Sequence, residues 1–374
     1  MKNIFIPIFF VCFCVFSQTS NKSVLAKYTD DEIKIDGVLD ENSWEAVAPA
    51  TNFFQYFPTD TAQAKRQVEI KFMFSDRNLY VGIKVYAKGK DYVIPSLRRD
   101  FRGGANDSVT LLFDTFNDGT NAFVFGSNPY GVRREILLSG GGNERQGFNS
   151  AWDTKWVGES VIHDDHYILE WKIPLSAFKY KEGETKWRFN SYHFDTQDNE
   201  RNTWINIPQN QNIYNLAFMG DLIFDRPLGK SKSPVSIIPF VNTITAKDFE
   251  NNENTSSFKI GGDAKLTIAN SMNLDLTLNP DFSQVEVDQQ VTNLTRFEVG
   301  LPERRQFFIE NSDLFGSFGD GRDSNPFFSR RIGIAKNIDG ESIENRIIAG
   351  VRLSGKVNNN LRLGILSMQT DEDI

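Results

Sequence analysis

The chain has almost no cysteine. Its 374 residues include two, Cys12 and Cys14, and both fall inside an apolar run at the N-terminus. If that run is removed on export, the mature chain has none, which excludes disulfide bonds, thiol catalysis and cysteine-ligated metal sites. The mature chain must then be stabilised by a hydrophobic core or by a membrane.

The same N-terminal run predicts export. Residues 1–17 contain one cation, Lys2, followed by the apolar stretch Ile4–Phe16 and the small residue Ser17. This is the pattern of a secretory signal peptide, and we expect cleavage after Ser17. The stretch is shorter than the ~20 apolar residues that a membrane-spanning helix needs. A buried N-terminal strand and a lipoprotein signal acylated at Cys14 are the alternatives.

The chain is also poor in histidine and in the motifs of enzymes. It has three histidines, no G-x-S-x-G motif of serine hydrolases, and a glycine run at Gly140–Gly142 that lacks the lysine of a phosphate loop. Its 49 acidic residues include no pair with a supporting glycosidase motif. We therefore predict a protein without catalytic residues or a cofactor, and leave open only the hydrolysis of O-glycosyl bonds.

Positive charge is in deficit as well. The net charge is −8, which repels nucleic-acid phosphates and argues against nucleic acid as a partner. Basic pairs such as Arg133–Arg134 are short, and we interpret them as ion-pairing or pore-lining groups.

Aromatic residues and alternating strands are abundant instead. Phenylalanine occurs 32 times and aromatics make up 13% of the chain, which suits pleated β surfaces. Residues 68–74 and 79–85 alternate between apolar and polar side chains on either side of a short turn. Pairing them as a hairpin sets Phe74 opposite Leu79 and places all the apolar side chains of the alternation on one face.

Further short strands follow at regular turn signals. A second hairpin is predicted from residues 108–115 and 121–127, and a glycine-rich loop follows at Ser139–Gly147. No long helical periodicity interrupts the pattern. We therefore predict an all-β chain whose residues 25–228 form a β-sandwich of the immunoglobulin or jelly-roll kind.

The character of the chain changes after a connector at Arg226–Pro234. Strands of about ten residues with one apolar face recur, and a turn at residues 358–360 pairs Val357 with Leu361 and Gly355 with Leu363. The opposite face carries cations such as Arg352. In an exported protein this pattern suits an antiparallel transmembrane β-barrel, although a second soluble sandwich would show the same alternation.

The first part resembles family 9 carbohydrate-binding modules. The resemblance rests on four runs in order, which are KIDGVLDENSW (Lys34–Trp44), KFMFSDRNLYVGIKVY, RRDFRGGANDSVTLLFDTFNDG and NPYGV. It covers about residues 25–228 and implies that a poly- or oligosaccharide binds to a β-sandwich.

The second part resembles a domain of bacterial outer-membrane proteins. The resemblance rests on Asn279–Phe315, which contains PERRQFFIEN, and on PFFSRRIGIAK (Pro326–Lys336). In that family a sugar-binding domain of the same type precedes a β-barrel domain of unknown function, DUF5916. The resemblance implies that residues 229–374 belong to a barrel in contact with lipid. Family members continue well beyond this length, so we expect the barrel to be incomplete here.

A sugar site needs flat aromatic faces with polar groups around them. Trp152 and Trp156, beside the glycine-rich loop, are the candidates for the aromatic platform. Arg98, Arg99 and Asp100 are the polar candidates, because this Arg-Asp run matches a family position. Packing in the core is the alternative for the two tryptophans, and a surface ion pair with Asp100 is the alternative for the two arginines.

Oxygen ligands crowd the turn of the second hairpin, at Asp114, Asn117, Asp118 and Asn121. Oxygen-rich loops suit calcium, and the resemblance implies structural calcium. The spacing is not that of a known calcium loop, and turn chemistry alone accounts for Asn and Asp at these positions.

We therefore expect a non-catalytic, carbohydrate-binding protein in the outer membrane of a Gram-negative bacterium, with the sandwich in the periplasm or on the cell surface. One alternative is an accessory module for a glycoside hydrolase in carbohydrate catabolism. Another is a structural plug or docking domain for the barrel, which is favoured if the two tryptophans prove buried.

Overall fold

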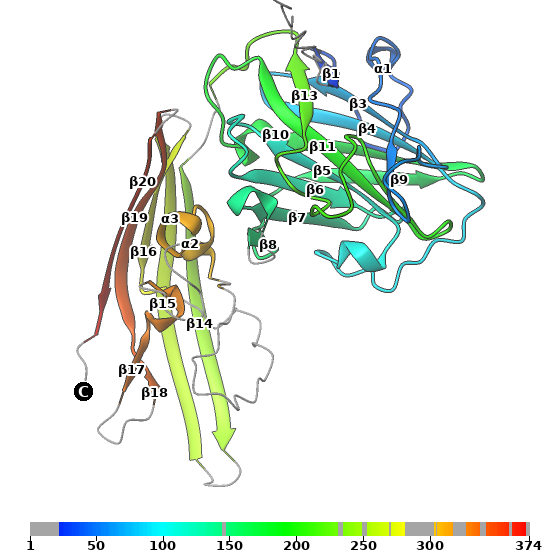
Figure 1. The fold of residues 1–374 in the computed structure, drawn as a ribbon. Coiled ribbons are helices and arrows are strands. Elements are labelled where there is room, and N and C mark those ends of the chain that lie inside the picture. Colours follow the sequence, from blue (N-terminus) through cyan, green and yellow to red (C-terminus); the bar gives the residue numbers. More distant parts are fainter. Residues whose placement is uncertain are drawn as a thin grey trace, which may run out of the picture.

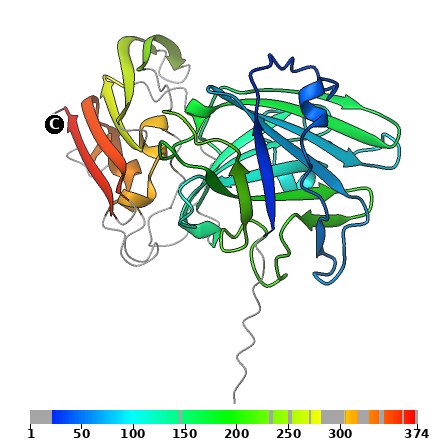
Figure 2. The same cartoon turned by 90° about the horizontal axis from the view of Figure 1, so that it is seen from above.

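The structure, a computed structural model, contains two parts built of β-strands (Figure 1; Figure 2). The predicted signal peptide at residues 1–17 lies outside the described residues, as does most of the segment Asn279–Phe315. The described residues are 22–143, 147–230, 235–248, 253–268, 271–280, 303, 305–316, 327–336, 342–358 and 361–371.

The N-terminal part is one 13-stranded sheet with the order β8-β7-β6-β5-β11-β13-β1-β3-β4-β10-β9, and β12 pairs with β11 and β2. The short helix α1 (Asn42–Glu45) precedes β2. The strands are β1 (Ser23–Tyr28), β2 (Phe54–Phe57), β3 (Val68–Phe74), β4 (Asn78–Tyr86), β5 (Ser108–Asp114), β6 (Ala122–Ser127), β7 (Arg133–Leu138), β8 (Phe148–Asn149), β9 (Val157–Ile162), β10 (His166–Pro174), β11 (Lys186–Asp195), β12 (Glu200–Thr203) and β13 (Gly220–Phe224).

This sheet folds over on itself into a β-sandwich, as the sequence predicted. Phe72 of β3 lies 5.0 Å from Phe189 of β11 and 6.2 Å from Phe113 of β5, measured between ring centroids. β3 and β5 are separated by three strands in the sheet order, so their rings meet across the core rather than along the sheet. Edge-to-face contacts of this kind fill the interior with aromatic side chains.

The predicted hairpins are present. β3 and β4 pair antiparallel, and every expected partner is found, from Phe74 opposite Leu79 to Val68 opposite Val85. β5 and β6 form the second hairpin. Strong alternation fixed the register of the first hairpin, because a slip by one residue would turn its apolar side chains out of the core.

The opening motif is held by a buried carboxylate on a distant strand. Glu170 of β10 accepts hydrogen bonds from the backbone N–H groups of Asp36 (3.0 Å) and Gly37 (3.1 Å), and from Trp44 Nε1 (3.3 Å). Gly37 has φ = 81°, and a Cβ there would lie 2.8 Å from Val161, so the turn requires glycine. Burial raises the pKa of Glu170 to about 7, against the three donors that favour its ionised form.

β5 is buried on both faces. Its inward residues join the aromatic core, while outward residues such as Leu112 join a second apolar cluster with side chains from β6, β7 and β11. Residues of the connection between β12 and β13, among them Ile213 and Leu216, cover this cluster. The sandwich therefore has an outer layer of loops over this half of the sheet.

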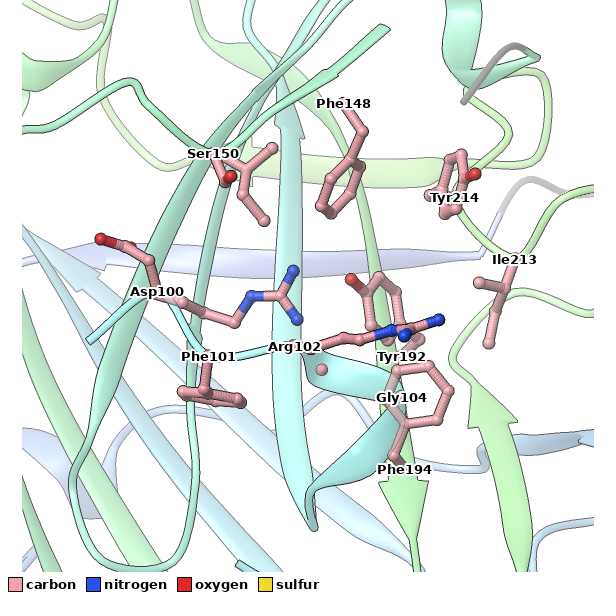
Figure 3. A pocket seen from close by; sticks show the side chains of 13 residues that line it. Asp100, Phe101, Arg102, Gly104, Phe148, Ser150, Tyr192, Phe194, Ile213 and Tyr214 are labelled. Atoms are coloured by element: carbon pink, nitrogen blue, oxygen red, sulfur yellow. The ribbon is translucent and has the colours of Figure 1, made fainter. Parts of the chain in front are cut away.

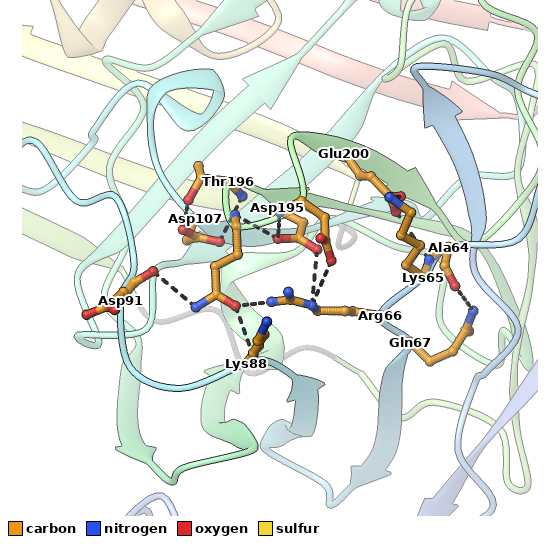
Figure 4. A network of polar contacts seen from close by, with 12 residues as sticks. Ala64, Lys65, Arg66, Gln67, Lys88, Asp91, Asp107, Asp195, Thr196 and Glu200 are labelled. Atoms are coloured by element: carbon orange, nitrogen blue, oxygen red, sulfur yellow. Dashed lines mark hydrogen bonds and ion pairs between the residues drawn. The ribbon is translucent and has the colours of Figure 1, made fainter.

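A polar network ties several of the remaining loops together (Figure 4). Arg66 Nε lies 2.9 Å from Asp198 Oδ2, and the N–H of Thr196 donates to Asp107 Oδ1 at 3.1 Å. Burial lowers the pKa of the neighbouring His193 to about 4, although the charge of Asp107 opposes this. The network joins the segments that lead into β3 and β5 to the turn between β11 and β12.

The C-terminal part is an antiparallel five-stranded sheet in the order β14-β15-β16-β19-β20. The described strands form an open sheet with edges at β14 and β20 and no closed barrel, and the incomplete transmembrane barrel that we expected stays a prediction. The strands are β14 (Ser236–Asp248), β15 (Glu253–Ile268), β16 (Met272–Leu278), β19 (Ile347–Asn358) and β20 (Leu361–Thr370); β17 (Ile334–Lys336) and β18 (Ser342–Glu344) pair separately. Gly355 pairs with Leu363 as predicted, but the prediction for Leu361 was wrong, because a register shift between Lys356 and Asn358 sets Asn358 opposite it in place of Val357. Among the described residues, no helix has both the length and the apolar character needed to cross a membrane.

This second sheet is polar on its covered face and apolar on its exposed face. Asn273 of β16 and Arg352 of β19 are 2% and 1% exposed, whereas Phe258 of β15 is 67% exposed. The helices α2 (Gln306–Ile309) and α3 (Asp313–Gly316) cover the polar face (Figure 1). There Arg352 Nη1 donates to the carbonyl of Glu310 at 2.8 Å, and Arg352 Nη2 lies 2.8 Å from Asp275 Oδ2.

The two parts meet at the turn between β5 and β6. Lys356 Nζ of β19 lies 2.6 Å from Asp118 Oδ2 and 4.9 Å from the ring centroid of Phe116. Lys179 Nζ of the sandwich donates to Thr267 Oγ1 of β15 at 2.9 Å. A cavity of about 60 Å³ lies beside these contacts.

Removing the buried carboxylate should change how stability depends on pH. The folded-state pKa of Glu170, about 7, exceeds its ordinary value of 4.5, so its protonated form stabilises the fold and this contribution is lost as pH rises from about 4.5 through 7. The slope is at most about 1.4 kcal/mol per pH unit. We expect Glu170→Gln to be less stable throughout and to lack this component of the decline.

The measurement is urea unfolding of the full chain at pH 5, 6, 7 and 8, followed by tryptophan fluorescence. Identical pH slopes for the parent and the variant would contradict the assignment.

Candidate functional site

A pocket of about 380 Å³ opens on the outer face of the β7–β11 half of the sandwich. Its wall combines one loop, two strands of the sheet, the region of β8 and the connection between β12 and β13. The residues that line it are Asp100, Phe101, Arg102, Gly103, Gly104, Arg134, Ile136, Phe148, Ser150, Tyr192, Phe194, Ile213 and Tyr214.

Aromatic rings make up much of this wall. Figure 3 shows Phe148 and Tyr214 on one side of the pocket, Phe101 and Phe194 on the other, and Arg102 between them. The rings of Phe148 and Tyr214 lie 5.4 Å apart at 46°, and those of Tyr192 and Phe194 lie 5.3 Å apart at 66°. Phe148, Phe194 and Tyr214 are half-buried, so each ring is packed by the protein and partly open to a ligand.

The guanidinium of Arg134 forms the charged part of the wall. Arg134 belongs to β7, is 4% exposed, and lies between two rings, 5.5 Å from Phe101 and 5.6 Å from Phe148. A Cβ on Gly103 would lie 1.9 Å from Arg134 Nη1, and one on Gly126 would lie 3.0 Å from Arg134 Cγ. Glycine at these two positions therefore makes room for the side chain.

Asp100 and Arg102 come from the loop that precedes β5. Asp100 adopts φ = 58°, and its Oδ1 accepts the backbone N–H of Glu135 at 3.2 Å. This contact fixes the loop against β7 and leaves Arg102 exposed at the pocket. Burial raises the pKa of Asp100, although the hydrogen bond from Glu135 opposes this shift.

The arrangement suits binding. Flat apolar rings can contact the apolar face of a sugar, and guanidinium groups can donate several hydrogen bonds to its oxygens. Among the described lining residues Asp100 is the one carboxylate, whereas the usual glycosidase mechanism needs two. No group of three or more His, Cys, Asp or Glu side chains placed to hold a metal occurs in the part of the chain that the structure describes.

The two predicted platform residues lie in the core. Trp152 and Trp156 are 4% and 3% exposed and pack against Phe125, with ring centroids 5.9 and 5.5 Å away. Trp156 also contacts Trp171, at 5.2 Å. Neither ring presents a face to solvent, because the segment that carries them folds under β6. The two tryptophans therefore pack in the core, which was the alternative to the predicted binding platform.

The predicted arginine run is divided between two places. Arg99 Nη2 pairs with the carboxylate of the buried Glu135 and lies 3.2 Å from Asp153 Oδ1. Arg98 is exposed and does not line the pocket, whereas Asp100 does. The partners of Arg99 are thus Glu135 and Asp153, and not the adjacent Asp100 as the surface alternative expected.

The predicted calcium ligands lie at the junction of the two parts. Asp114 accepts the N–H groups of Phe116 and Gly119, at 3.2 and 2.8 Å. Asp118 accepts from Thr120 through Oδ1 and pairs with Lys356 through Oδ2. All four carboxylate oxygens thus face donors.

The two amides of the predicted calcium set differ. Asn121, in the amide orientation that satisfies both its atoms, accepts from Arg362 at 3.1 Å. Asn117 Nδ2 donates to Glu184 Oε1 at 3.1 Å, whereas its buried Oδ1 has no hydrogen-bond partner. Most of the predicted ligand oxygens thus face protein donors, and the calcium site stays a prediction.

Most of the residues that line the pocket were not among the predicted site residues. Phe101 and Arg102 directly follow the predicted run Arg98–Asp100, so the sequence motif pointed to the correct loop but to the wrong residues in it. Arg134 was interpreted as an ion-pairing or pore-lining group. Phe148 and Tyr214 carry no local pattern, because a loop aromatic gives no indication of the strand it will cover.

Two family profiles match the chain. One, described as a carbohydrate family 9 binding domain-like family, matches residues 35–225. The other, a domain of unknown function (DUF5916), matches residues 234–373. A search of curated proteins finds no match.

Solved structures show weaker likeness. A family 9 carbohydrate-binding module from Caldicellulosiruptor kristjanssonii, in complex with cellotriose, is 18% identical over 57% of this chain and 98% of its own, with a TM-score of 0.40. A protein from Bacteroides uniformis is 17% identical over 55% of this chain and 100% of its own, with a TM-score of 0.43. Likeness at this level identifies no residue of the site.

Truncating the buried tryptophans should cost stability. We expect Trp152→Ala and Trp156→Ala each to lower the free energy of unfolding by about 3–5 kcal/mol, because each leaves a cavity in the aromatic core. Trp156→Ala also removes the indole N–H that donates to Glu135 at 3.2 Å. The check is urea unfolding, with Tyr130→Ala as the matched control, since Tyr130 is 57% exposed. Losses below about 1 kcal/mol would show that the rings are not core residues.

Proposed function

Because the chain belongs to the carbohydrate family 9 binding domain-like family, we propose that it binds a saccharide, without catalysis, in the pocket between β7, β11 and the loops that cover them. The single observation that carries this proposal is the pocket wall itself. It combines half-buried rings on opposite sides with charged donors between them. Sugar rings have apolar faces and polar edges, so a wall of this composition complements both.

We also propose that the C-terminal sheet is part of a barrel in an outer membrane, and that the protein is exported to that membrane. The support is the reversed burial of the sheet. Its polar side chains are covered by protein, while Ile237, Val241, Phe258, Ile260 and Ile365 are exposed on the described strands. Transmembrane barrels have this arrangement, with an apolar face toward lipid and a polar interior. A soluble sheet would bury the opposite face.

The length of four of the five strands agrees with this role, whereas β16 has 7 residues and is shorter. β14 has 13 residues, β15 has 16, β19 has 12 and β20 has 10, and a spanning strand needs about 9–11. The sandwich would then lie in the periplasm or on the cell surface, attached through the junction at Asp118 and Lys179.

A second candidate function is a docking domain for the barrel. Burial of Trp152 and Trp156 favours it, as do the contacts from Lys356 to Asp118 and from Lys179 to Thr267. The two functions are compatible, because the junction and the pocket use different residues of the sandwich.

Truncating the pocket aromatics should weaken saccharide binding. A glycan array with the full chain would identify a ligand, and calorimetry would then compare variants. We expect Phe148→Ala and Tyr214→Ala each to lower affinity about tenfold, which corresponds to about 1.4 kcal/mol. Tyr130→Ala, outside the pocket, is the control and should bind normally. If the parent chain binds nothing across a broad array, the sugar proposal is wrong.

The lipid contact can be tested with introduced tryptophan. All six native tryptophans precede residue 229, so the C-terminal part has no fluorescence of this kind. The protein would be placed in vesicles whose lipid acyl chains carry bromine, which quenches tryptophan fluorescence on contact. We expect Phe258→Trp to add a tryptophan emission that is quenched. Tyr130→Trp, on an exposed turn of the sandwich, should add an unquenched one. Equal quenching of the two added signals would contradict the membrane proposal.

A further inference from the structure

The charge of the pocket wall is unbalanced. Its described residues include two cations, Arg102 and Arg134, and one anion, Asp100. Asp100 is partly engaged, because its Oδ1 accepts the backbone N–H of Glu135. A neutral sugar would leave one net positive charge in the pocket without a counter-charge.

Arg134 is the unusual member of this set. It is 4% exposed, forms no ion pair with any described residue, and its Nε has no hydrogen-bond partner. Buried charges in proteins are normally paired, because removing an ion from water is costly. The guanidinium cannot lose its proton to avoid this cost. The rings of Phe101 and Phe148 offset part of it through cation–π contact.

Two buried carboxylates of the sandwich show the normal arrangement. Glu170 accepts three hydrogen bonds, and Glu135 is paired with Arg99 and accepts from Trp156. The fold therefore satisfies these two carboxylates from its own donors. At Arg134 it instead provides space, through Gly103 and Gly126, and an open pocket.

We propose that this pocket selects acidic saccharides, with Arg134 and Arg102 binding the carboxylate of a hexuronate residue. The proposal rests on the proposed sugar-binding function and names its ligand class. The planar fork of a guanidinium matches a carboxylate with two parallel hydrogen bonds. The rings of Phe148 and Tyr214 then contact the apolar face of the same or the adjacent sugar.

The test compares hexuronate trimers with their methyl esters, which have the same shape and no charge. Calorimetry would use the full chain with galacturonate, glucuronate and mannuronate trimers, at low and at high salt. We expect at least one acid to bind about 10- to 100-fold more tightly than its ester, because hydrogen bonds to charged groups are the stronger kind. This advantage should shrink at high salt.

Three variants locate the preference. Arg102→Met and Arg134→Met should each remove most of the advantage of the acid, because each should lower the affinity for the acid much more than the affinity for the ester. Gly103→Ala keeps both charges but displaces Arg134, since its Cβ would lie 1.9 Å from Nη1. It should have the same effect, which would show that the position of the Arg134 guanidinium matters and not only its charge. The matched control is Arg133→Met, because Arg133 lies beside Arg134 on β7 and lies over Trp156 rather than lining the pocket.

The outcomes separate the two proposals. If esters and neutral cello-oligosaccharides bind and no acid has an advantage, the selection of acidic sugars is wrong and sugar binding stands. An advantage that survives in Arg102→Met and Gly103→Ala would also overturn it, even if Arg134→Met fails to fold. If neither acids, esters nor neutral sugars bind, the proposed function falls with it.

Discussion

Successive side chains of a β-strand point to opposite faces of its sheet, so every strand needs a suitable environment on both sides. In the sandwich the inner faces cover each other with aromatic rings, and the loops after β7 and β12 cover the outer face of β5, β6, β7 and β11. That covering is incomplete where the loop at Asp100–Gly104 approaches Phe148 and Tyr214. The pocket is the space left between this loop and those two rings, and its aromatic side chains are of the same kind as those that cover the sheet elsewhere.

The same constraint gives the C-terminal part its character. Helices α2 and α3 cover the polar face of β16, β19 and β20, where Arg352 pairs with Asp275. On the opposite face, apolar side chains such as Phe258 and Ile365 are exposed among the described residues. Apolar surface of this extent calls for an apolar partner, and in the function that we propose this partner is lipid.

The β7–β8 hairpin lies between the pocket and the junction with the C-terminal part. Ile136 and Phe148 line the pocket, while Leu137 and Asn149, their neighbours in sequence, line the cavity at the junction with the C-terminal sheet. Alternation again explains this, because adjacent residues point to opposite faces. One thin layer of protein therefore separates the pocket from the contacts made by Lys356 and Arg362.

The sequence by itself determined the strands, the hairpin registers and the family, because these depend on local alternation, turn residues and motifs that are read along the chain. Tertiary structure decided the rest. Trp152 and Arg134 show this, since each has neighbours far away in sequence that decide whether it is buried or faces a pocket. The sequence pattern shows that a strand has two faces, but only the packing of distant loops determines which face holds the core and which holds the site.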